Sequence, residues 1–180
     1  MSVLQIIYGY QPIFKKKAEH VEVISDEIRD IISDMFDTLY SEEAVGLGAN
    51  MIGILKKIVV IDLFENGQKN QICLINPEII SKSEEMQSFK EASLSFPSVS
   101  AEISRPKSIK VKYMDAYDGS IKEMSASGFL SSVIQHEMDY LDGVTIFDHF
   151  SPIKKEMMLK KMEKFMKLNP PHVHSHSCTH

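Results

Sequence analysis

Cysteine, tryptophan and long apolar runs are scarce or absent in this chain, which has two cysteines and no tryptophan among its 180 residues. Cys73 lies in an apolar segment and Cys178 in a polar one, so the sequence predicts no disulfide framework. No apolar run approaches the roughly 18 residues that a membrane-spanning helix needs. These absences argue against a disulfide-held secreted domain and against a membrane protein.

Positive charge is also in deficit. The 20 lysines and arginines are outnumbered by 25 aspartates and glutamates, which gives a net charge of -5. A nucleic-acid surface needs a basic patch, so direct DNA binding is not expected. The first residues, Met1 to Ile7, contain no basic leader before an apolar stretch, and a cytoplasmic location is the expectation.

Hydrophobic periodicity indicates a mixed fold. Apolar residues from Val23 to Leu39 follow helical spacing, with Ser25 as the expected cap, and a glycine-bearing loop follows at 44–51. Extended segments are expected at 57–63, 72–80, 89–96, 99–104, 108–117 and 120–126. The dipeptides Asn66-Gly67 and Asp118-Gly119 predict the turns of two hairpins.

Two more helices are expected in the second half of the chain. The period changes from 2 to 3.6 near Phe129, and Asp142-Gly143 ends this helix. Its inward face is expected to hold Phe129, Leu130, Val133, Ile134 and Glu137. A last helix begins at Ser151-Pro152 and stops before Pro170. The order of elements predicts one α+β domain over residues 1–168 and a histidine-rich, disordered tail over 169–180.

The segment from Gln135 to Tyr140 carries the strongest chemical signal. It reads Gln-His-Glu-Met-Asp-Tyr. A histidine at position 140 would complete a His-Glu-x-x-His pattern, in which two imidazoles on one helical face hold a metal and the glutamate moves a proton. Here the first imidazole, His136, and the carboxylate, Glu137, are present, and the second imidazole is replaced by the phenol of Tyr140.

This segment, the loop from Ala44 to Met51 and the segment Glu91-Ala92-Ser93-Leu94-Ser95 together resemble the three motifs of the peptide deformylase family. Members of that family remove the formyl group from the N-terminal methionine of new bacterial and organellar proteins. The resemblance runs from Val3 to about Phe165. It implies small, mostly antiparallel sheets around a central helix that bears the His-Glu pair, with a C-terminal helix.

The resemblance also assigns roles to positions that have changed. The family's first motif, Gly-x-Gly-Leu-Ala-Ala-x-Gln, ends in a glutamine that donates to the oxygen on the reacting carbon, and that position is Met51 here. In the second motif, Glu-Gly-Cys-Leu-Ser, the metal-binding thiolate corresponds to Ser93, with Leu94 beside it in the oxyanion region. In the third, Gln-His-Glu-x-Asp-His, the last metal ligand corresponds to Tyr140.

His136 thus remains as a residual metal ligand and Glu137 as a residual general base. The resemblance places the substrate groove at Val45, Gly46, Leu47, Leu94 and Val133.

A neutral serine and a phenol with a pKa near 10 are poor substitutes for a thiolate and an imidazole, since a catalytic site of this kind needs three strong donors. No metal is therefore predicted at this site; any that did bind would be one divalent ion of Fe, Zn, Ni or Co. The prediction is a catalytically inactive or strongly impaired deformylase relative that retains at most the binding of N-terminal peptides of nascent proteins.

Other interpretations stay open at this point. The chain could be an active deformylase that uses Ser93, His136 and Tyr140 around an unusual metal. Ser93 could act as a nucleophile with His136 as its base, although no orienting carboxylate is legible from the sequence. His136 and Glu137 could instead be a structural polar pair, hydrogen-bonded to Tyr140, Ser93 or water, with Met51 filling the core.

Two features near the C-terminus also allow alternatives. The tail could bind Zn, Ni or Cu through histidine and cysteine side chains that alternate along it, or it could be a disordered terminus without a binding role. The candidate ligands are His172, His174, His176, Cys178 and His180. The lysine pairs Lys154-Lys155 and Lys160-Lys161 are expected to form a solvated helix face, with ribosome contact as the alternative.

Overall fold

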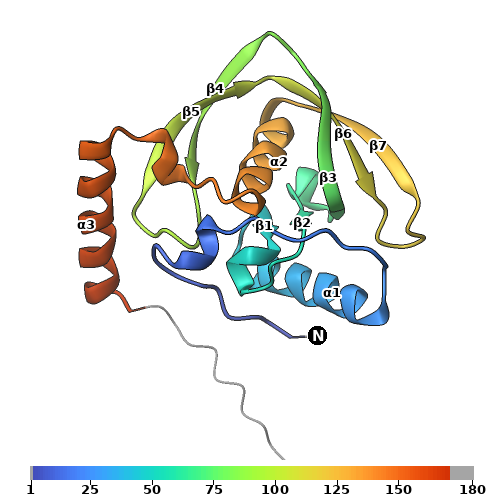
Figure 1. Ribbon diagram of the computed structural model, residues 1–180, viewed down its shortest axis with the longest axis horizontal. Helices are drawn as coiled ribbons and strands as arrows, with labels where there is room; N and C mark the ends of the chain where they lie inside the picture. Colours follow the sequence, from blue (N-terminus) through green and yellow to red (C-terminus); the bar gives the residue numbers. More distant parts are fainter. Residues whose placement is uncertain (1, 171–180) are drawn as a thin grey trace, which may run out of the picture.

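Helix α2 (Gly128–Leu141) lies at the centre of the computed structural model, which describes residues 2–170, and the strands curve around it (Figure 1). The other two helices are α1 (Asp26–Ser41) and α3 (Pro152–Leu168). The strands are β1 (Gly46–Gly48), β2 (Ile58–Ile61), β3 (Ile72–Lys82), β4 (Met86–Ala92), β5 (Ser100–Pro106), β6 (Ser108–Met114) and β7 (Ile121–Ser127). Short 3-10 helices are η1 (Pro12–Lys15), η2 (Ala49–Ile52), η3 (Glu65–Gly67) and η4 (Ile146–His149).

Two antiparallel sheets form the framework around α2. Five strands are ordered β1-β2-β3-β6-β7, and β4 pairs with β5 in a separate sheet that arches over the helix (Figure 1). Because β1 is the last strand of its sheet and β4 belongs to a pair, each has a strand partner on one side only. These two open edges face the region in which the candidate site lies.

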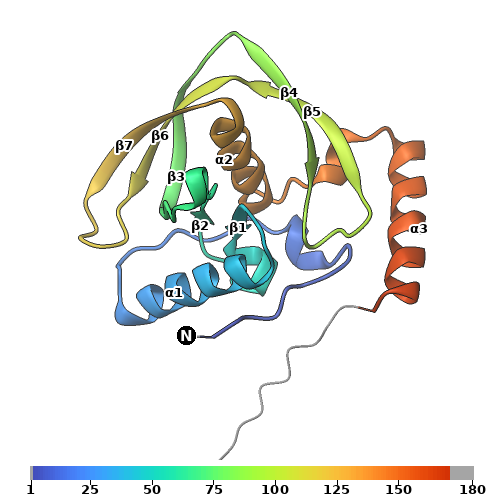
Figure 2. The ribbon, with the colours of Figure 1, turned by 180° about the vertical axis from the view of Figure 1, so that it is seen from behind.

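The apolar faces of these elements make two hydrophobic clusters, one on each side of α2. Val133, Ile134 and Leu141 pack with buried residues of β2, β3 and β6. Tyr140 belongs to the other cluster, which includes the buried face of α1 and the aromatic rings of Phe14 and Phe96. Seen from behind, α1 runs below β1 and β2 (Figure 2). The helix that bears the His-Glu pair is therefore fixed on both sides by packing.

Local sequence signals explain how the three helices begin. The Ser25 hydroxyl accepts a hydrogen bond from the Ile28 N–H at 3.3 Å, as expected for an N-cap. The Ser151 hydroxyl accepts from the Lys154 N–H, and Pro152 occupies the first turn of α3. By contrast, α2 follows directly from β7 and begins at Gly128, whose φ of +60° suits glycine.

The α+β architecture predicted from the sequence is confirmed, with differences in detail. The loop expected at 44–51 contains the short strand β1, which the alternation of so few residues could not reveal. The extended segment expected at 89–96 ends as a strand at Ala92. Phe129, expected to point inward, is 48% exposed and lies at the edge of a cavity. Among the described residues, no helix is long and apolar enough to cross a membrane.

Candidate functional site

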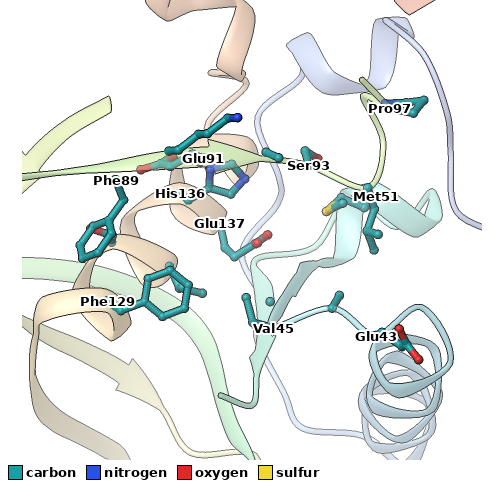
Figure 3. A pocket seen from close by; sticks show the side chains of 17 residues that line it. Glu43, Val45, Met51, Phe89, Glu91, Ser93, Pro97, Phe129, His136 and Glu137 are labelled. Carbon is teal, nitrogen blue, oxygen red and sulfur yellow. Dashed lines mark hydrogen bonds and ion pairs between the residues drawn. The ribbon is translucent and has the colours of Figure 1, made fainter. Parts of the chain in front are cut away.

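A cavity of about 500 Å³ opens between α2, β1 and the end of β4. Figure 3 shows Phe89 and Phe129 at one end of it and Met51 and Pro97 at the other. Most of the lining is apolar, and its polar side chains include those of the motif residues Glu91, Ser93, His136 and Glu137. A largely apolar cleft with a few convergent polar groups is the usual form of a ligand site.

Strand β1 approaches α2 closely because it contains two glycines. A Cβ atom at Gly46 would lie 2.8 Å from Oε1 of Glu137 and 3.0 Å from Val133 Cγ1. At Gly48 the corresponding distance to Oε2 of Glu137 would be 3.4 Å. The two glycines therefore make room for the Glu137 carboxyl group against the strand, and the Gly48 N–H lowers the pKa of that group through a hydrogen-bonding interaction.

A buried network of charged side chains lies beside the cavity and connects the elements that form its wall. Arg105 on β5 donates from Nε to Oε1 of Glu91 at 2.6 Å and from a second nitrogen to Oε2 at 3.0 Å. Its remaining terminal nitrogen donates to Oδ2 of Asp139 at 2.7 Å. The ring nitrogen Nδ1 of His136 lies 2.7 Å from Oε2 of Glu91. One guanidinium thus joins β4, β5 and α2, and one carboxylate orients the imidazole.

This network shifts the pKa values of its members. Burial by itself lowers the pKa of His136, but the hydrogen bond with Glu91 and the nearby charge of Glu137 outweigh burial, and the pKa is raised. Burial by itself raises the pKa of Glu91, but its hydrogen bonds with His136 and Arg105 prevail, and this pKa is lowered. An ionised Glu91 is therefore a fixed part of the structure at neutral pH.

Glu137 lies in a different environment one residue further along α2. Its side chain projects into the space between β1 and Ser93 (Figure 3). Burial raises the pKa of its carboxyl group, against the smaller opposing effect of His136. Its Oε2 atom has no hydrogen-bond partner among the described residues. This carboxyl group faces the cavity without the ion pair that Glu91 has.

Tyr140 is part of the core. Its side chain is 1% exposed, and its ring contacts Phe96 at 5.8 Å and Phe14 at 6.2 Å between centroids. It also lies 4.8 Å from the His136 ring at an interplanar angle of 32°. Burial raises the pKa of the phenol, whereas the nearby Ser93 hydroxyl has a smaller, opposing effect. The Ile146 N–H also lowers the pKa of the phenol, although within the described residues neither the phenol oxygen nor Ser93 Oγ makes a hydrogen bond of ordinary geometry.

The other residues expected in the site are only partly brought together. Val45, Gly46, Leu94 and Val133 line the cavity, as the predicted groove requires. Leu47 is fully buried in the hydrophobic cluster and does not line it, because side chains alternate along β1. Met51 is 2% exposed and packs in the core with one face toward the cavity. The tail residues His172, His174, His176, Cys178 and His180 lie outside the described residues.

Arg105 and Asp139 are the site residues that sequence reasoning missed. Asp139 was within the central motif, but nothing in its spacing showed a partner on another element. Arg105 lies on an unremarkable strand, where it is paired with Gln87 of β4, and its long side chain reaches Glu91 further along that strand. The available signal was a single arginine among alternating residues of a predicted strand, which does not specify a buried ion pair.

Comparison with known proteins identifies the family to which this arrangement of residues belongs. The sequence model of the polypeptide deformylase family matches residues 3–156. The chain belongs to the polypeptide deformylase family.

A peptide deformylase-like protein of Rickettsia conorii is 52% identical to the present family member over 176 residues, covering 98% of this chain and 96% of that relative. A peptide deformylase of Rickettsia canadensis is 38% identical over 170 residues, covering 91% and 97%. Among solved structures, the deformylase of Legionella pneumophila has a TM-score of 0.87 and 33% identity, with 96% and 100% of the two chains covered. The deformylase of Ehrlichia chaffeensis has a TM-score of 0.86 and 31% identity over 93% and 98%.

The residues of this deformylase relative do not fit the metal that its family resemblance implies. In the described part of the chain, no three histidine, cysteine, aspartate or glutamate side chains gather in an arrangement that could hold a metal ion. The two positions beside His136 provide a serine hydroxyl and a buried phenol whose proton is held more firmly than in water. A neutral donor set of this kind is far weaker than the thiolate and imidazoles of a catalytic site.

Proposed function

We propose that this deformylase relative does not hydrolyse formyl-methionine at a useful rate and instead binds the N-terminal segments of peptides in its groove. The observation that carries the proposal is the position of Tyr140. Its ring is packed among Phe14, Phe96 and His136, and its oxygen is buried. The position of the last metal ligand is thus occupied by an aromatic side chain of the core.

The rate enhancement that a metal ion and an oxyanion donor would supply is too large for Glu137 alone to replace, which supports the proposed loss of activity. A metal lowers the pKa of bound water from about 15.7 to about 7, which corresponds to roughly 12 kcal/mol of ease in forming hydroxide. Glu137 acting alone as a general base contributes only about 10²–10⁴-fold. Met51 offers no hydrogen-bond donor to an oxyanion, and such a donor contributes about 3 kcal/mol. Base catalysis by Glu137 does not close this gap.

The groove itself has the features of a peptide site. It lies between the open edges of β1 and β4, where an extended peptide could form backbone hydrogen bonds by adding a strand. Its lining of Val45, Leu94, Phe129 and Val133 offers apolar contacts for side chains. The proposed ligands are N-terminal peptides of nascent proteins, and contact of the chain with the ribosome stays a prediction.

A binding and turnover experiment on the same samples tests this proposal. Fluorescently labelled peptides that begin with methionine, with and without a formyl group, are titrated with the full-length protein, and the formylated peptide is afterwards checked for hydrolysis by mass spectrometry. We expect saturable binding and an intact formyl group. Efficient hydrolysis would favour the alternative, an active deformylase with atypical ligands.

A matched pair of substitutions locates the binding. Ala92 is exposed at the end of β4 and lines the cavity, so Ala92→Trp should fill the groove at little cost to folding. Ser104 is exposed on β5 and lies outside the cavity lining. Ala92→Trp should weaken peptide binding at least tenfold, and Ser104→Trp should leave it unchanged. Equal binding by both variants would contradict a peptide site in this groove.

A further inference from the structure

We propose that the outward face of helix α3 binds the surface of a lipid membrane that carries anionic headgroups. This surface is separate from the groove, so the inference goes beyond the proposed peptide binding and does not depend on it. Figures 1 and 2 show α3 at the outer side of the molecule, with every other labelled helix and strand on one side of it. The face that points away from the body is therefore open to a partner.

The inner face of α3 attaches the helix to the body. Met162 is 2% exposed and belongs to the same hydrophobic cluster as Phe14 and Phe96. Met158 and Met166, one turn before and one turn after it, are half-buried against that cluster. Because these three methionines follow i, i+4, i+8 spacing, they define which side of the helix points inward.

The outward face exposes large apolar side chains. Ile153, Met157 and Leu168 are 76%, 60% and 72% exposed, and Phe165, at the edge of the same face, is 40% exposed. At about 100° per residue, the first three lie within an arc of about 60° around the helix axis. Single exposed apolar residues are common on protein surfaces, whereas several on one side of a helix indicate an interaction surface.

Positive charge surrounds these apolar side chains. Helix α3 has six lysines and two glutamates, which gives it a net charge of +4 in a chain whose net charge is -5. The exposed lysines on or beside the outward face are Lys154, Lys160, Lys161, Lys164 and Lys167. Both glutamates, Glu156 and Glu163, lie on one flank of the helix, about 60–80° from Ile153. The outward face of α3 thus combines apolar side chains with lysines and has no acidic residue.

An anionic bilayer surface complements both properties of this face. Its acidic headgroups attract lysines, and its acyl boundary accepts apolar side chains. Lysine stems can lie along that boundary while their ammonium groups stay among the headgroups. Nucleic acid would pair with the lysines through its phosphates but would leave Ile153, Met157 and Leu168 without an apolar partner. Binding of this kind needs no membrane-spanning helix, and none is found among the described residues.

Co-sedimentation of the full-length protein with lipid vesicles tests the inference. Vesicles of phosphatidylcholine are compared with vesicles of phosphatidylcholine mixed with phosphatidylglycerol, at about pH 8, where the histidines of the tail are uncharged. We expect the partition coefficient to be at least about tenfold larger on the anionic vesicles and to fall as salt is added. Equal partitioning on the two kinds of vesicle, or no binding to either, would overturn the inference.

A pair of apolar substitutions tests the contact with the acyl boundary. Ile153→Ser combined with Leu168→Ser should lower the partition coefficient on the anionic vesicles at least about tenfold, because binding scales with buried apolar area. Val23→Ser combined with Ile121→Ser is the matched control, since these residues are 71% and 63% exposed and lie outside α3. The control should bind as the wild type does. Circular dichroism and the melting temperature establish that each variant is folded.

A pair of charge substitutions tests the contact with the headgroups. Lys161→Gln combined with Lys164→Gln should also lower the partition coefficient at least about tenfold, whereas Lys82→Gln combined with Lys110→Gln, which removes two exposed lysines of β3 and β6, should leave it unchanged. Loss of binding in the lysine variant of α3 but not in its serine variant would indicate a purely electrostatic surface, such as nucleic acid uses, and would overturn the inference. Equal losses in the α3 variants and in their controls would overturn it as well.

Discussion

Two groups of residues at or behind the cavity wall differ in how many hydrogen bonds connect them to the rest of the fold. The supporting network of Glu91, Arg105, His136 and Asp139 is linked by short hydrogen bonds between three elements. The second group, Ser93 and Tyr140, holds hydroxyl groups that make no hydrogen bond of ordinary geometry within the described residues.

The two groups of residues are expected to differ in how well they tolerate substitution. Removing one member of the supporting network would leave a buried charge without a partner, which is strongly destabilising. The Ser93 and Tyr140 hydroxyls make no hydrogen bond of ordinary geometry within the described residues, so removing either hydroxyl breaks no such bond. We therefore expect loss of the hydroxyl at Ser93 or Tyr140 to be tolerated better than loss of the guanidinium at Arg105.

The largest expected effect comes from breaking the supporting network. Arg105→Met should lower the free energy of unfolding by about 3–5 kcal/mol, because it leaves Glu91 buried without its main cationic partner. Urea denaturation followed by circular dichroism measures this change. Lys107→Met is the matched control, since Lys107 forms an exposed ion pair with Glu85 and should cost at most about 1 kcal/mol. Similar losses for the two variants would mean that the buried network has no special structural role.

The pH dependence of stability should reveal the same network with a smaller effect. The pKa of Glu91 is lowered in the folded protein, so its ionised form contributes stability that is fully present above its unfolded pKa, near 4.5. That contribution is lost as the pH falls through the lowered folded pKa. The free energy of unfolding of the wild type and of Glu91→Gln should therefore differ more at pH 7 than at pH 3. A difference that stays constant over this range would contradict the assignment.

Substitution in the second group should have the smallest effect on stability. Tyr140→Phe removes a buried hydroxyl that makes no hydrogen bond of ordinary geometry within the described residues, so the free energy of unfolding should stay the same or rise by about 1 kcal/mol. Tyr40→Phe is the comparison, because the Tyr40 hydroxyl donates to Asp62 and accepts from Gln71, each at 2.9 Å. That variant should lose about 1 kcal/mol. A clear loss for Tyr140→Phe would show that its hydroxyl is structurally engaged.

The sequence was sufficient to predict the fold, the assignment of the replaced positions stays a prediction, and the supporting network was not foreseen. Helical period, caps and turn residues located α1, α2 and α3, and the motif resemblance pointed to Ser93, His136 and Tyr140. Arg105 could not be found in this way, because its role depends on the antiparallel pairing of β4 with β5 and on the approach of α2. Leu47 was misplaced for a related reason, since the direction of a side chain on a three-residue strand follows from tertiary structure.

The most direct test of the central claim is deformylation of a formyl-methionyl peptide by the full-length protein, supplied anaerobically with iron, nickel, cobalt or zinc. The wild type should show no useful turnover with any of these ions. A variant with Ser93→Cys, Tyr140→His and Met51→Gln should gain activity, because residues 136 and 140 lie one helical turn apart and both imidazoles would face the new thiolate. Either single ligand substitution should do much less. Wild-type turnover within about tenfold of the enzyme median of about 10 s⁻¹ would contradict the account.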